Sequence, residues 1–104
     1  MQMQQGDVTF ETVDQLPDGL KKLEAKNGVY VLAEGEVTGH AHTIAADDAD
    51  VFVADDGTLY AVVKQDVKVR HQEHKTVTLV PKVWRIGRIL TKDWKTKLTR
   101  KVVD

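Results

Sequence analysis

The chain has 104 residues, of which 41% are hydrophobic and 30% charged, and its formal net charge is −1. We expect a single β domain over 1–104, because this length suits one core and the composition is not that of a disordered chain. With neither Cys nor Ser, the chain excludes disulfides, thiolate metal ligands and serine or cysteine nucleophiles. It also lacks a signal-peptide pattern and any apolar run near the roughly 20 residues of a membrane span, so we expect a cytoplasmic protein with no membrane association.

The first third of the chain predicts two strands and a turn. Residues 1–6 are mostly polar, and we expect a flexible leader there. Residues 8–13 alternate apolar and polar side chains, which predicts an edge strand. Leu residues recur at helical spacing over 16–23, but an internal Pro and Gly limit this segment to a turn or one short helix. The continuous apolar run 29–33 follows an Asn-Gly turn signal and predicts a strand buried on both faces.

A histidine-bearing strand is expected over 36–45. Because side chains alternate along a strand, His40 and His42 share one face with Glu36 and Ile44. The opposite face carries small residues, which allow another layer to approach closely.

The second half of the chain predicts further strands. An Asp-Asp-Gly turn makes 51–63 the clearest hairpin of the sequence. Alternation after residue 66 places His71 on the inward face of the next strand. A short strand over 75–80 leads to a Pro at a strand junction. Residues 83–90 form a strand whose Trp lies in the core, and 100–104 form a short final strand.

About eight short strands separated by turns predict an all-β fold. The absence of long helical periodicity excludes a helix bundle. We therefore expect one small barrel or jelly-roll, of the double-stranded β-helix kind.

All four histidines of the protein fall in two pairs, one at strand spacing and one at turn spacing. Imidazoles at positions i and i+2 of a strand lie about 6.6 Å apart and can converge on one ion. Glu36 and Glu73 are candidates for ligands or for acceptors that orient the rings. We expect one divalent transition metal (zinc, nickel, iron or copper), held by His40, His42, His71 and His74.

Three blocks and the C-terminus carry a family resemblance: residues 32–42, with the pattern Gly-Glu-Val-Thr-Gly-His-x-His, the His-x-x-His of 71–74, residues 79–86 and residues 100–104. Together they resemble a family of small uncharacterised bacterial and phage proteins. Residues 35–42 also partly resemble the first motif of cupins, which implies a jelly-roll with an internal metal site. The resemblance implies no activity.

Several functions stay open at this point. Four bound histidines would make a structural metal, whereas three and a water would allow catalysis, so the chain's status as an enzyme is undecided. An alternative is a non-enzymatic assembly or binding module, virion-associated if phage-encoded, with histidines at a subunit interface; in either case we expect a homo-oligomer. A third alternative is a small barrel that binds nucleic acid through the basic segment 82–101, which we do not favour.

Overall fold

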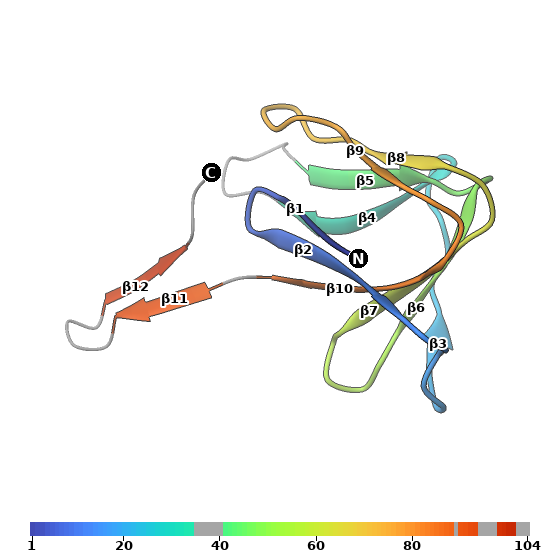
Figure 1. Cartoon of the computed structure of the whole chain (residues 1–104), viewed down its shortest axis with the longest axis horizontal. Helices are drawn as coiled ribbons and strands as arrows, with labels where there is room; N and C mark the ends of the chain where they lie inside the picture. The colour runs from blue at the N-terminus through green and yellow to red at the C-terminus, as the bar shows by residue number, and fades with distance from the viewer. Residues whose placement is uncertain (35–40, 89, 94–97, 102–104) are drawn as a thin grey trace.

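The computed structural model describes residues 1–34, 41–88, 90–93 and 98–101, and this part of the chain is all-β without a helix. Figure 1 shows the arrangement of its strands. In chain order they are β1 (Gln2–Gln5), β2 (Val8–Val13), β3 (Lys21–Lys22), β4 (Val29–Glu34), β5 (Ala41–Ala45), β6 (Ala49–Val53), β7 (Leu59–Val63), β8 (Val67–Val69), β9 (Val77–Leu79), β10 (Val83–Arg88), β11 (Leu90–Asp93) and β12 (Leu98–Lys101).

The largest sheet has six strands in the order β1-β2-β10-β7-β6-β3. All of its pairings are antiparallel, and the predicted hairpin is confirmed as β6 and β7, in which Val51 pairs with Ala61. Strand β2 pairs with β1 on one side and with β10 on the other. The prediction that residues 8–13 form an edge strand is therefore wrong, because β1 covers that edge.

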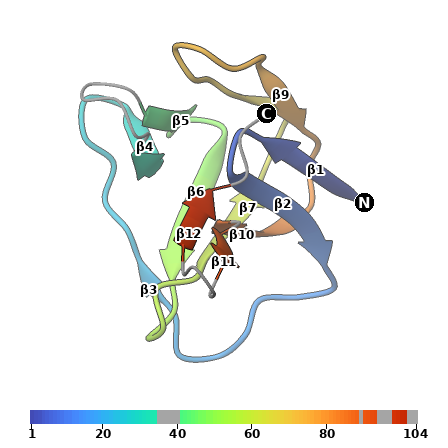
Figure 2. The same cartoon turned by 90° about the vertical axis from the view of Figure 1, so that its left-hand side faces the viewer.

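A second layer consists of two hairpins, β4–β5 and β8–β9. An antiparallel bridge between Thr43 and Arg70 joins β5 to β8, so the four strands follow one another across this layer. The layer lies over the six-stranded sheet, as Figure 1 shows, and Figure 2 gives the same two layers from the side. None of the sheets closes into a barrel in the described part of the chain.

The core fills the space between the two layers. Trp84 and Phe10 are fully buried, and the indole N–H of Trp84 donates to the carbonyl of Val80 at 2.9 Å. The expectation that the Trp of residues 83–90 lies in the core is confirmed. The remaining buried apolar residues are Val8, Tyr30, Leu32, Ile44, Ala49, Val51, Ala61, Val63, Val67, Val69, Leu79 and Ile86.

Three expectations differ from the structure. Residues 1–6, expected as a flexible leader, contain β1, which pairs with β2 along its whole length. Residues 16–23 contain no helix, and Lys21–Lys22 form the short strand β3 against β6. The run 29–33 is buried on one face only, since Val31 is 49% exposed. Strand β4 belongs to the second layer, and the face of β4 that points away from the six-stranded sheet meets solvent.

The hairpin β11–β12 forms a two-stranded sheet of its own, separate from the two layers. Figure 1 shows it projecting from the rest of the molecule beyond β10. Among the residues with a described structure, no helix is long and apolar enough to cross a membrane.

Candidate functional site

His42 lies on β5 with its side chain directed into the interior. The alternation of β5 buries His42 and Ile44, each 1% exposed, while Ala41, Thr43 and Ala45 face outward. The histidine-bearing face is thus the inward face of the strand. Burying a polar ring among apolar residues costs free energy unless its nitrogens are hydrogen-bonded.

His71 and His74 come from the connection between β8 and β9 and meet His42 at one end of the core. The ring centroids of His42 and His71 are 4.4 Å apart, and those of His71 and His74 are also 4.4 Å apart. The rings of His42 and His74 are nearly parallel, with centroids 5.9 Å apart. Three of the four histidines therefore form one cluster, although His42 is far from the other two in the sequence.

Gln5, the last residue of β1, anchors this cluster. Its side chain is 3% exposed, and its amide Nε2 donates to the carbonyls of Val69, at 2.8 Å, and Lys75, at 2.7 Å. These two bonds fix which end of the amide is nitrogen. The amide oxygen Oε1 then lies 2.7 Å from His42 Nδ1 and can only accept. His42 therefore carries its proton on Nδ1, and Nε2 has an available lone pair.

Gly6 and Asp7 form the turn between β1 and β2 and complete the surroundings of the rings. Gly6 has φ +59°, and a Cβ at this position would lie 2.7 Å from His74 Nε2, so only glycine lets the ring lie this close. Asp7 Oδ1 lies 3.8 Å from His42 Nε2, and Asp7 Oδ2 accepts a hydrogen bond from Arg88 at 3.0 Å. The polar start of the chain thus forms one wall of the cluster.

Polar burial in the described residues is confined to this region. Three polar or charged residues are buried there, namely Gln5, Asp7 and His42. Such groups are costly to bury and need specific partners, so their concentration at one point distinguishes a built site from ordinary surface chemistry.

The electrostatics of the cluster favour a neutral His42. The pKa of His42 is lowered to about 4, mainly by burial of the ring and next by the nearby His71; the charge of Asp7 opposes this shift, while His74 and Arg88 add to it. At neutral pH, His42 is consequently an uncharged imidazole whose Nε2 can accept a proton or bind a metal ion.

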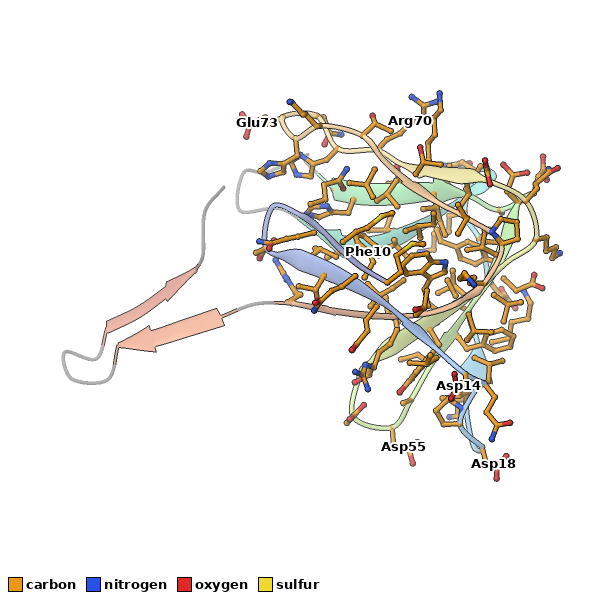
Figure 3. All side chains as sticks on the ribbon, viewed as in Figure 1. Phe10, Asp14, Asp18, Asp55, Arg70 and Glu73 are labelled. Carbon is orange, nitrogen blue, oxygen red and sulfur yellow. The ribbon has the colours of Figure 1, made fainter. Side chains whose placement is uncertain are left out.

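His71 has a different protonation pattern. The backbone N–H of Glu73 donates to His71 Nδ1 at 3.0 Å, so a neutral His71 carries its proton on Nε2. Glu73 and Arg70 are exposed and lie at the outer edge of the second layer (Figure 3). Gln72 ties the β8–β9 connection to β5, since its Oε1 accepts from the N–H of Ala41 at 2.9 Å.

The structure brings together His42, His71 and His74, whereas His40 and Glu36 lie outside the described residues. No group of three or more His, Asp or Glu side chains within residues 1–34, 41–88, 90–93 and 98–101 is arranged to hold a metal ion. Four further residues of the histidine cluster's surroundings were not predicted from the sequence, because neither a polar turn nor a single Arg produces a periodic pattern. They are Gln5, Gly6, Asp7 and Arg88.

Comparisons with known proteins place the chain in a family without assigning an activity. No curated protein and no solved structure matches it. Residues 4–89 match the family described as Domain of unknown function (DUF8820). The matched region spans the two layers and every residue of the cluster described above. The chain belongs to this family of uncharacterised domains, DUF8820.

Proposed function

We propose that this protein binds one divalent transition-metal ion through its histidine cluster. The observation that carries the proposal is the convergence of His42, His71 and His74, with centroids 4.4 to 5.9 Å apart, around a buried ring whose tautomer Gln5 holds. With metal–nitrogen bonds of about 2.1 Å, two imidazoles on one ion have centroids roughly 5 Å apart. The centroid distances lie on either side of this value, so the rings would have to shift to reach the coordination geometry, which no described group of side chains has now.

Gln5 supplies the feature most typical of a metal site. A metal-binding imidazole generally donates its second N–H to a carbonyl or carboxylate, which fixes the ring and its tautomer. The bond from His42 Nδ1 to Gln5 Oε1 has this form and leaves Nε2 to act as the ligand. An ordinary core histidine needs only satisfied nitrogens, without two more imidazoles packed beside it.

Ion binding by this cluster requires one local change. His71 must either bind through Nδ1, and so lose its bond from Glu73 N–H, or move its proton to Nδ1 and bind through Nε2. Both routes reorganise the β8–β9 connection. The proposal includes His40 as the fourth ligand and a cupin-like relation of the two layers.

The metal content of protein purified without added metal or chelator tests the proposal. We expect close to one equivalent of zinc, nickel, iron or copper per chain, and zinc binding by the chelator-treated protein in calorimetry. His42→Ala should remove most of this binding, and so should His71→Ala and His40→Ala. Lys75→Ala, an exposed neighbour of His74, is the matched control and should bind as the wild type does. Protein that carries no metal and binds no added zinc or nickel at neutral pH would refute the proposal.

The variant His74→Ala then distinguishes a structural metal ion from a catalytic one. If this variant no longer binds metal and has a lower thermal stability, all ligand positions of the site are filled by side chains and the ion is structural. If it spares the ion, three ligands and an open position remain, as catalysis requires. Because ligation needs neutral imidazole, affinity should fall as the pH drops through about 6.5.

A second candidate function is self-assembly, and the hairpin β11–β12 favours it. A two-stranded hairpin is marginally stable alone in water, and this one pairs only with itself among the described strands. A second copy of the chain that covers the hairpin would stabilise it. Thr99→Pro, which removes an N–H from β12, should then reduce the oligomeric mass measured by light scattering, whereas Thr99→Val should not. A wild-type monomer across the micromolar range would exclude this function.

A further inference from the structure

The turn between β1 and β2 places a carboxylate beside His42, the histidine whose tautomer is set by the buried side chain of Gln5. Asp7 is 9% exposed, and one of its oxygens is anchored by Arg88 at 3.0 Å. Its other oxygen, Oδ1, is directed toward His42, 3.8 Å from Nε2. Anchoring through Oδ2 therefore orients Oδ1 toward the cluster.

The separation of 3.8 Å is too long for a hydrogen bond but suits two ligands of one cation. Because the His42 proton is on Nδ1, Nε2 carries a lone pair, and the carboxylate oxygen Oδ1 of Asp7 is the second electron-pair donor at this distance. Bonds of about 2.1 Å from each atom to one ion would subtend an angle of roughly 130° at this separation. An approach of about 0.4 Å would bring that angle to the tetrahedral value.

We infer that Asp7 is a ligand of the bound metal through Oδ1, so that the ion is held by mixed imidazole and carboxylate donors rather than by imidazoles alone. This inference rests on the proposed function. The ring of His74 also lies against this turn, since a Cβ at Gly6 would be 2.7 Å from its Nε2. The turn of residues 5–7 therefore serves three of the groups around the ion: Gln5 orients His42, Gly6 admits His74, and Asp7 binds.

The donor set decides which ions the site takes. A carboxylate oxygen adds a hard, anionic ligand and partly neutralises a divalent charge, which favours Zn²⁺, Co²⁺ and Fe²⁺ over Cu⁺. Arg88 holds the distal oxygen, as partners of ligating carboxylates generally do.

Co²⁺ titration followed by visible absorbance tests the inference, because the d–d bands report the donor atoms directly. Wild-type protein should bind one Co²⁺ per chain. Asp7→Asn, which keeps the size of the side chain, should weaken binding by more than about 100-fold and change the band positions, since loss of a ligand exceeds the 10- to 100-fold effect of an orienting partner.

The matched control is Asp50→Asn, a partly buried carboxylate paired with Lys22 and Lys64 and remote from the histidines in the fold. It removes the same charge and should bind Co²⁺ within about 3-fold of the wild type. If Asp7→Asn alone does not fold by circular dichroism, the double variant Asp7→Asn/Arg88→Gln removes both charges of the pair and takes its place. Affinity within 10-fold of the wild type with an unchanged spectrum would overturn the role of Asp7 while leaving the proposed function intact. A wild-type protein that binds neither Co²⁺ nor Zn²⁺ would overturn both.

Discussion

The side chain of Gln5 provides the sharpest test of how this site is held together. It makes three hydrogen bonds: it donates to the carbonyls of Val69 and Lys75 and accepts from His42, and only the bond to Lys75 is partly rather than fully buried. Gln5→Met keeps the length of the side chain and removes all three. Each bond contributes about 1 kcal/mol net. The partners left behind are buried, and the apolar gain from Met offsets only about 1 kcal/mol.

We therefore expect Gln5→Met to lower the free energy of unfolding by about 2 to 3 kcal/mol, equivalent to a fall in Tm of roughly 10 to 20 °C for a domain of this size. Urea denaturation in the presence of EDTA, followed by far-UV circular dichroism, measures the stability without any contribution from metal. Gln2→Met is the matched control, since Gln2 is an exposed residue of the same strand, and it should change stability by less than about 0.5 kcal/mol. A Gln5→Met variant as stable as the control would refute the assignment of Gln5 as the anchor of the cluster.

Three more outcomes are expected. The free energy of unfolding should fall by about 3 kcal/mol as the pH drops from 6.5 to about 4, because His42 takes up a proton in the unfolded state at a higher pH than in the folded state. Urea titrations measure this loss, and the loss for the wild type should exceed the loss for His42→Gln by the same amount. Gly6→Ala should displace the His74 ring and weaken zinc binding in calorimetry, whereas Gly19→Ala, also at positive φ but with no atom within 4 Å of the added Cβ, should not. In metal-free protein, long-range ¹H–¹⁵N spectra should show protonation on Nδ1 of His42 and on Nε2 of His71; the opposite tautomers would contradict the hydrogen-bond assignment.

Local patterns in the sequence were sufficient for several elements of the fold. Alternation after residue 66 identified β8 and its inward residues Val67 and Val69, and the Asp-Asp-Gly turn identified the β6–β7 hairpin. Alternation also placed His42 on one face with Ile44, and His71 in line with Val67 and Val69. These predictions succeeded because the side-chain period of a strand is a property of the backbone alone.

The direction and depth of burial followed only from the assembled layers. Alternation shows only that His42 and Ile44 share a face of β5; this face is fully buried because the six-stranded sheet lies beneath it. For the run 29–33, the sequence predicted more burial than the structure has. This run is apolar throughout, but only one face of β4 has a layer to pack against, so Val31 remains 49% exposed.

What the sequence determined by itself was the all-β class and the pairing of the histidines, both readable from neighbours a few residues apart. The surroundings of the histidines were decided by tertiary structure. Gln5 contacts the carbonyls of Val69 and Lys75, 64 and 70 residues away, and Asp7 contacts Arg88, 81 residues away. A polar segment at the start of a chain has no periodicity that distinguishes a leader from the wall of a site. Its role comes from the partners that folding brings to it, because a buried amide is stable only where donors and acceptors from other strands meet it.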